Sequence, residues 1–183
     1  MSEETLIKHC APTLAGLKTG SLFVCDYKDK YDLLDEIREF NSVLLPKGVR
    51  LIPMRIQNGK ALIYVYRMSS LKADLEDKRA FKVLNERGYP CERHSECISC
   101  LKEHINAKEH FPHEVGLFLG YPPEDVIGFI ENDAKNYKYC GMWKVYGNIS
   151  KAKETFATFK KCTGNFENRH RNGVSIRELT VAG

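Results

Sequence analysis

The first candidate reactive residue is Cys10, which follows His9 and precedes the segment PTLAGLK, residues 12–18. Proline favours the first position of a helix, so the sequence predicts a short helix over 12–18 with Cys10 beside its N-terminus. At a helix N-terminus, unpaired backbone N–H groups and the helix dipole would stabilise the thiolate of Cys10. That thiolate would act as a nucleophile or as a metal ligand. Four neighbours of Cys10 are the expected ligand contacts: His9, Thr13, Gly16 and Lys18. The alternative is that Cys10 packs beneath the helix while His9 faces solvent.

The second candidate is the pair His113 and Glu114 in the segment FPHE. Histidine titrates near neutral pH, so His113 is the expected general acid or base. Neighbouring side chains diverge on a helix, so Glu114 would orient another group or simply complement the helix dipole. The aromatic segment 137–146 supplies Trp143 as a pocket residue, although aromatic strand residues are more often part of a core.

The cysteines form the third candidate, a metal or iron–sulfur site. There are seven: Cys10, Cys25, Cys91, Cys97, Cys100, Cys140 and Cys162. Cys97 and Cys100 form one Cys-x-x-Cys, and with His104 they share one stripe of a predicted helix; Cys91 and His94 precede it. A second Cys-x-x-Cys is lacking, so Cys140 and Cys162 are the thiols that folding would have to bring in as further ligands. The alternative is a half-buried helix with incidental thiols.

Composition excludes several classes of protein. A hydrophobic content of 43% indicates a globular chain, and a net charge of +4 is too small to indicate nucleic-acid binding. A helix-turn-helix spacing around Gly120 is contradicted by the acids Glu124 and Asp125, which would repel a phosphate backbone. The acidic start has no signal-peptide pattern, no apolar run could cross a membrane, and the odd cysteine count argues against disulfides, so we expect a cytoplasmic location. Walker, GxGxxG, HExxH and GxSxG motifs are absent.

Hydrophobic periodicity and turn residues predict an α+β fold, with amphipathic helices packed against a mainly antiparallel sheet. The clearest signal is Asn58-Gly59 between two extended segments, which predicts a hairpin with a type I′ turn. Further helices are expected at 31–40, 70–87, 95–108, 112–119, 122–130, 150–162 and 175–181, and strands at 21–27, 49–57, 60–67 and 137–146. No linker is evident, so residues 1–183 are predicted to form a single globular domain.

Four strings across the chain resemble the DUF 3793 family of clostridia and related anaerobes: HCAPTLAG from His9, FPHEVGLFLGYPPEDVIGFIEN from Phe111, CGMWKVYG from Cys140 and KKCT from Lys160. The resemblance implies a soluble, cytoplasmic, single-domain bacterial protein without an assigned activity. It also implies a link to redox or iron metabolism, because members are encoded near flavodoxins and iron-uptake proteins. The family strings include Cys10, His113, Glu114, Cys140 and Cys162, and leave out Cys97 and Cys100.

Three hypotheses follow. In the first, the protein binds an unknown small molecule and is a thiol-dependent enzyme, with Cys10 as nucleophile, His113 as acid or base and Glu114 as the orienting group, and with a redox protein as a partner. In the second, it binds a metal or cluster without catalysis. In the third, it is a protein-interaction module, which predicts an exposed apolar patch. The sequence indicates no particular cofactor.

Overall fold

The structure is a computed structural model that describes residues 1–90, 93–107 and 111–183. The chain divides into two compact units: unit 1 comprises residues 1–71 and 159–183, and unit 2 comprises residues 72–158. Each unit is described by itself, and the expectation of a single domain over 1–183 stays a prediction. The α+β class and the antiparallel sheet are confirmed.

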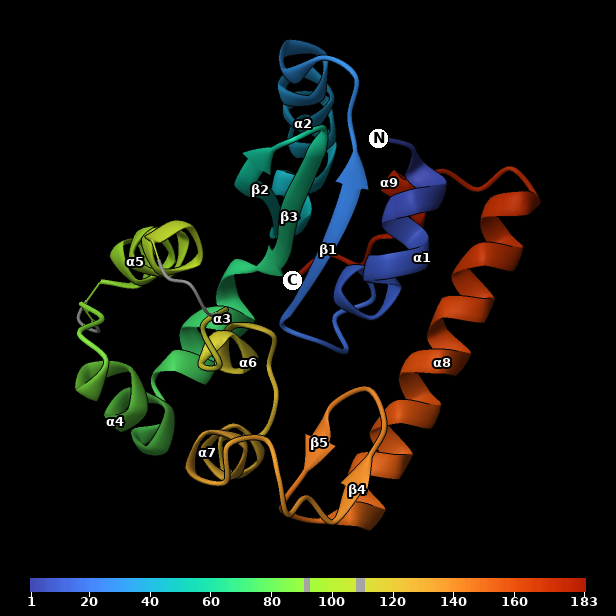
Figure 1. Cartoon of the computed structure of the whole chain (residues 1–183). Helices are drawn as coiled ribbons and strands as arrows, with labels where there is room; N and C mark the ends of the chain where they lie inside the picture. The colour runs from blue at the N-terminus through green and yellow to red at the C-terminus, as the bar shows by residue number, and fades with distance from the viewer. Residues whose placement is uncertain (91–92, 108–110) are drawn as a thin grey trace. The chain divides into compact units, whose positions relative to one another are not determined.

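The elements carry the labels of Figure 1. The helices are α1 (Glu3–Leu14), α2 (Lys30–Leu44), α3 (Met68–Leu75), α4 (Lys78–Glu86), α5 (His94–Ala107), α6 (Val115–Phe118), α7 (Pro123–Glu131), α8 (Ile149–Arg171) and α9 (Ile176–Leu179). A 3-10 turn, η1 (Leu45–Lys47), follows α2. The strands are β1 (Gly20–Asp26), β2 (Val49–Gln57), β3 (Lys60–Arg67), β4 (Tyr139–Cys140) and β5 (Lys144–Val145).

Unit 1 is built on a three-stranded sheet of order β1-β3-β2, in which β3 is antiparallel to both neighbours. The predicted hairpin is confirmed, with Gln57 paired to Lys60 across a two-residue turn. Asn58 and Gly59 have φ angles of 53° and 73°. Both angles are positive, as a type I′ turn requires.

One buried cluster of unit 1 lies on one face of this sheet. Ala61, Ile63 and Val65 alternate along β3 and belong to one buried cluster with apolar residues of α1, α2 and α9. Figure 1 shows α1 alongside β1, with which it makes direct contact. Residues two apart on a strand share a face, so these three side chains pack together; Leu62, Tyr64 and Tyr66, on the other face of β3, are buried as well.

The first helix is longer than predicted and begins earlier. Ser2 accepts a hydrogen bond from the backbone N–H of Thr5 at 3.2 Å and caps α1, and Glu3 and Glu4 occupy its first turn. The prediction of a helix over 12–18 is therefore wrong, because Pro12 lies near the end of α1 rather than at its first position. Cys10 lies in the interior of α1, away from the positive end of the dipole.

Unit 2 carries mainly helices and one short hairpin. The predicted helix over 70–87 is two helices, because Asp77 accepts hydrogen bonds from the N–H groups of Arg79 and Ala80 and starts α4 afresh. The expected strand over 137–146 is instead the hairpin of β4 and β5. The helix expected over 150–162 continues to Arg171 as α8. The last residue of the helix expected over 95–108 lies outside the described residues.

Across the parts of the chain that the structure describes, no helix combines the length and the apolarity needed to cross a bilayer.

Candidate functional site

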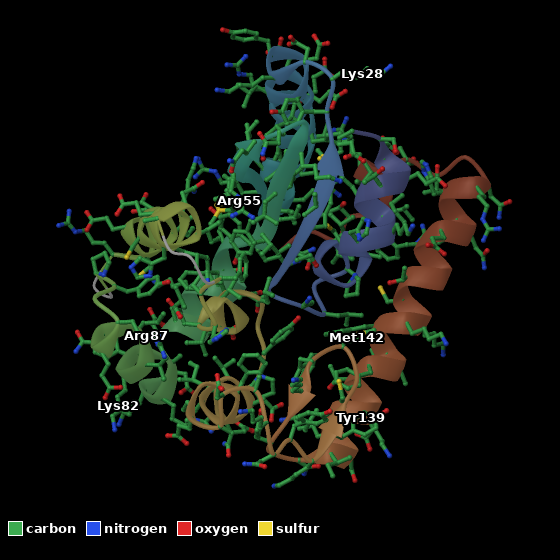
Figure 2. The ribbon with its side chains drawn as sticks, in the orientation of Figure 1. Lys28, Arg55, Lys82, Arg87, Tyr139 and Met142 are labelled. Carbon is green, nitrogen blue, oxygen red and sulfur yellow. The ribbon has the colours of Figure 1, made fainter. Side chains whose placement is uncertain are left out.

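Unit 2 contains a pocket with a volume of about 360 Å³. Its walls come from the segment before α6, from α7 and from the β4–β5 hairpin, whose turn carries Met142 (Figure 2). The lining residues are Phe111, Pro112, His113, Val115, Gly116, Tyr121, Asp125, Val126, Phe129, Cys140, Gly141, Met142, Trp143 and Lys144. This volume is in the range of small-molecule sites, and the mixture of apolar walls and a few polar groups is typical of them.

Asp125 holds the hairpin against α7. Its Oδ2 accepts a hydrogen bond from Nε1 of Trp143 at 2.7 Å, and its Oδ1 accepts the backbone N–H groups of Tyr146 and Gly147 at 2.8 Å each. The Asp125 side chain is buried, with 3% exposure. Hydrogen bonds to a carboxylate are stronger than neutral ones, so these three bonds fix the position of the indole in the pocket wall.

Two aromatic rings contact Trp143, of which Tyr121 also lines the pocket. Tyr121 stacks on the indole with ring centroids 4.6 Å apart, and Phe156 meets it edge-on at 4.4 Å. A Cβ on Gly141 would lie 2.2 Å from the Phe156 ring, so this packing needs glycine at 141. Burial raises the pKa of the Tyr121 phenol, so Tyr121 contributes as a neutral surface. The wall is suited to a flat apolar group.

Glycine also sets the spacing between α7 and the segment after the hairpin. A Cβ on Gly128 would lie 2.4 Å from Cγ of Tyr146, well inside van der Waals contact. The two chain segments therefore approach more closely than any other residue at 128 would allow.

The pocket carries two groups able to bear positive charge, His113 and Lys144. His113 is exposed and meets the ring of Phe129 edge-on, with centroids 5.0 Å apart. The Lys144 ammonium donates a hydrogen bond to the Ala134 carbonyl at 2.8 Å and lies 5.7 Å from the centroid of Phe129. An ammonium has three donors, so Lys144 can bind a ligand as well. The Asp125 carboxylate is already engaged, and the free polar capacity of the pocket therefore favours an anion.

Three residues predicted from the sequence line this one pocket: His113, Cys140 and Trp143. Cys140 is an exposed thiol at the start of the hairpin turn. The arrangement can hold a small molecule against an aromatic wall, with an imidazole and a thiol at its edge.

Cys10 lies in a different environment from the one expected. Its side chain has no exposed surface and belongs to the core of unit 1. Burial raises the pKa of Cys10 to about 12, although nearby Lys18 and a hydrogen bond with Ser21 act in the opposite direction. The argument for a thiolate at a helix start is therefore wrong, because Cys10 lies in the interior of α1 and packs in the core of unit 1.

The other residues expected to bind ligand beside Cys10 have structural contacts in unit 1. His9 is exposed and stacks on Phe23 with centroids 5.0 Å apart, and the Thr13 hydroxyl lies 3.0 Å from that of Ser21. Burial lowers the pKa of Lys18 to about 8, against the raising influence of Cys10. Gly16 follows the end of α1 with a φ of 76°.

Sequence reasoning missed Arg67, a buried cation at the C-terminal end of α1. Its Nε donates to the Thr13 carbonyl at 2.6 Å, and its Nη2 donates to the carbonyls of Leu14 and of Val181, the latter at 2.7 Å. A cation is favourable at a helix C-terminus, where carbonyl groups are otherwise unpaired. Arg67 thus joins α1, β3 and the last residues of the chain.

Glu114 diverges from His113, as expected of neighbours, and points into unit 2. It has 1% exposure and accepts a hydrogen bond from the Tyr89 hydroxyl at 2.9 Å. Glu114 does not line the pocket, so it does not share a ligand with His113.

The metal hypothesis receives no support from the described residues, among which no group of three or more His, Cys, Asp or Glu side chains is placed to hold an ion. Cys140 belongs to unit 2, whereas Cys162 is half-buried against the core of unit 1, where burial raises its pKa. Cys140 and Cys162 as joint ligands therefore stay a prediction. Cys91 and the side chain of His94 lie outside the described residues.

Sequence reasoning missed Asp125 and Lys144 as parts of the site. Asp125 was considered from the sequence as an acid that would repel a phosphate backbone, whereas its carboxylate accepts three hydrogen bonds from the hairpin segment. One signal in the sequence could have indicated this role. Asp125 comes three residues after Pro122, in the first turn of a helix, and a side chain there can reach a neighbouring loop.

The fold is thus an α+β fold whose second unit contains a pocket of small-molecule size. A sequence model of the family described as "Protein of unknown function (DUF3793)" matches residues 6–180. The chain belongs to this family, and the resemblance noted from its sequence is confirmed. No curated protein and no solved structure matches the chain.

Proposed function

We propose that the protein binds a small, flat, mainly apolar molecule with an anionic group in the pocket of unit 2. The observation that carries this proposal is the pocket itself, where an indole fixed by Asp125 stacks with Tyr121 in the wall, and the Lys144 ammonium and the His113 imidazole are among the lining groups. The apolar part of the ligand would pack on Trp143. Its anionic group would be bound by Lys144 and by His113 when protonated.

A thiol-dependent reaction at this pocket is the extension of the proposal that the lining residues support. Among the described residues, Cys140 is the only cysteine that lines the pocket, and it is exposed; the imidazole of His113 lines the same pocket and is a group that can transfer protons. The redox or iron-related role and the redox partner stay predictions.

The experiment compares naphthoate with naphthamide by isothermal titration calorimetry. The two probes share one flat apolar body and differ in charge. We expect naphthoate to bind roughly tenfold more tightly, since one charge-assisted hydrogen bond is worth about 1.5 kcal/mol or more. Trp143 is the only tryptophan of the chain, so its fluorescence reports whether the probe has entered this pocket.

Lys144→Met should remove most of the preference for naphthoate and leave naphthamide binding nearly unchanged. Lys135→Met is the matched control, because Lys135 is an exposed lysine outside the pocket. Binding of neither probe, or equal binding of both with no response of Trp143, would refute the proposal. If naphthoate binds but a protein partner displaces it, the exposed apolar residues Phe111 and Met142 would indicate the interaction-module alternative instead.

A further inference from the structure

A second cluster of reactive groups lies in unit 2, outside the pocket. It consists of one carboxylate, one imidazole, one thiol, one phenol and one guanidinium: Glu114, His104, Cys100, Tyr89 and Arg87. Arg87 directly follows α4 (Figure 2), Cys100 and His104 lie on α5, and Glu114 precedes α6. Chemistry at this cluster would be separate from the binding proposed for the pocket.

The carboxylate of Glu114 is the fixed end of the cluster. Burial raises its pKa, but hydrogen bonds from its own backbone N–H, from Tyr89 and from His104, together with the charge of Arg87, outweigh this and hold the pKa below its ordinary value. Nη1 of Arg87 lies 3.5 Å from Oε2 of Glu114. The buried side chain is therefore a carboxylate with a balancing cation.

The hydrogen bonds determine which nitrogen of His104 carries a proton. Nδ1 of His104 lies 3.3 Å from Oε1 of Glu114 and 3.1 Å from the Tyr89 hydroxyl oxygen. Tyr89 has a single hydroxyl proton and donates it to Glu114. Both neighbours of Nδ1 are thus acceptors, so Nδ1 carries the proton. In the neutral ring, Nε2 then carries a lone pair and no proton.

That lone pair faces a thiol. Nε2 of His104 lies 3.6 Å from Sγ of Cys100, one helical turn earlier on α5. Residues four apart share a helix face, which is why the pair meets. Cys100 is half-buried, so its sulfur is partly open to solvent, and it also lies 4.0 Å from the carbonyl oxygen of Gly88.

The order thiol, imidazole, carboxylate is the arrangement that activates a nucleophile in enzymes. His104 can take the proton of Cys100, and the carboxylate of Glu114 stabilises the imidazolium that results. We propose that Cys100, His104 and Glu114 form a thiol relay in which Cys100 exchanges with small disulfides, with His104 as the base and Glu114 as a positioning residue.

Chemistry at sulfur fits this location better than acyl transfer does. Cys100 lies within α5, where backbone N–H groups are already bonded to carbonyls one turn earlier and cannot stabilise an oxyanion. Thiol–disulfide exchange needs only a thiolate, an accessible disulfide and a proton for the departing thiolate.

The step balances without another reactant. His104 accepts the proton of Cys100, and the thiolate attacks one sulfur of the small disulfide. The disulfide bond breaks as a new bond forms between Cys100 and that sulfur. The departing thiolate leaves with the bonding electron pair and takes the proton from His104.

Among the residues that the structure describes, three titratable or charged groups from neighbouring elements lie around this thiol and its imidazole, and a fourth, Cys97, lies one turn earlier on α5. His104 is the cation that forms beside the sulfur, and Glu114, with Arg87, is held at the far side of the ring. Tyr89 stays neutral, because burial and the charge of Glu114 raise its pKa. Cys97, one turn before Cys100, is buried, and its thiol donates to the Pro90 carbonyl at 3.3 Å.

The test measures iodoacetamide alkylation of each cysteine against pH, with the modified peptides resolved by mass spectrometry. The exposed Cys140 serves as an internal reference. We expect Cys100 to react about tenfold faster than Cys140 at pH 6, where an ordinary thiol is almost fully protonated. Oxidised glutathione should form a mixed disulfide with Cys100 under the same conditions.

Two variants show whether the reactivity of Cys100 comes from the relay or only from the exposure of its thiol. His104→Gln should move the alkylation profile of Cys100 to higher pH and remove the advantage at pH 6, and Glu114→Gln should do the same to a smaller degree. Glu103→Gln is the matched control, an exposed charge beside His104 on the same helix. Circular dichroism and Trp143 fluorescence verify folding.

If Cys100 reacts no faster than Cys140 at pH 6, or if His104→Gln leaves the profile of Cys100 unchanged, the relay is overturned. Because Glu114 is buried, Glu114→Gln can unfold unit 2. In that event the alkylation profile of His104→Gln alone decides the outcome, because His104 is partly exposed.

Discussion

Asp125 gives the sharpest test of how the pocket is built. Asp125→Ala removes the acceptor of three hydrogen bonds and leaves the indole N–H and two backbone N–H groups of the hairpin segment without it. A hydrogen bond to a charged group is worth about 1.5–3 kcal/mol, so three give an upper range of roughly 4.5–9 kcal/mol. Water can reach part of the vacated site, and the bonds are not additive. We therefore expect a loss of about 4 kcal/mol in the free energy of unfolding of unit 2.

Asp125→Asn separates the shape of the side chain from its charge. The amide oxygen can still accept both backbone N–H groups, whereas its NH2 would face the indole N–H of Trp143. We expect a loss of about 2 kcal/mol, from one broken bond and weaker remaining ones. The matched control is Asp133→Asn, because Asp133 is 87% exposed and its positive φ suits asparagine.

The assay is urea unfolding followed by the fluorescence of Trp143. This residue belongs to unit 2 and is the only tryptophan, so the transition reports on the pocket. With a urea slope of about 2 kcal/mol per molar, the midpoint of Asp125→Ala should fall by roughly 2 M. The reasoning is refuted if both Asp125 variants unfold at the same urea concentration as Asp133→Asn.

Four further predictions concern both units. Cys10 should resist alkylation until urea unfolds unit 1, as peptide mass spectrometry of the native and denatured protein would show; rapid native labelling contradicts its burial. Gly128→Ala should cost about 1–3 kcal/mol in urea unfolding, because its methyl overlaps Tyr146. Arg67→Met should cost about 3 kcal/mol by circular dichroism, as three carbonyls lose a charged donor. For Lys18, the unfolded state binds more protons between about pH 8 and 10.5, so stability rises with pH there. The stability gain of Lys18→Met should accordingly be largest near pH 7 and shrink by pH 10; a pH-independent gain contradicts the lowered pKa.

The elements that were predicted correctly depend on local information. The Asn58-Gly59 turn needs only two residues that accept positive φ, and the structure has both. Amphipathic spacing likewise identified α2, because a helix face that packs on a core repeats every three to four residues.

The start of α1 was predicted wrongly because one local rule was applied in isolation. Pro12 suits a first helical position, but Ser2 caps the chain ten residues earlier, and a helix already in progress accommodates a proline near its end. This error affects the functional prediction, because the expected thiolate of Cys10 depended on a helix that starts at Pro12.

The pocket could be predicted only in part. Residue type alone identified His113, Cys140 and Trp143. Their spacing in the sequence does not show that they line one pocket, because the turn between α7 and the hairpin determines whether they meet. The inward direction of Asp125 and the capping role of Arg67 depend on tertiary contacts between segments far apart in the chain.

His113 and Glu114 are consecutive residues whose side chains serve different neighbourhoods, one the pocket and the other the thiol relay. Their Cα atoms are about 3.8 Å apart, so a single peptide plane connects the two places. If a molecule bound in the pocket turned that plane, the carboxylate of Glu114 would move relative to the imidazole of His104. Binding of a molecule in the pocket would then change the reactivity of the Cys100 thiol, and modification of Cys100 would change the affinity of the pocket.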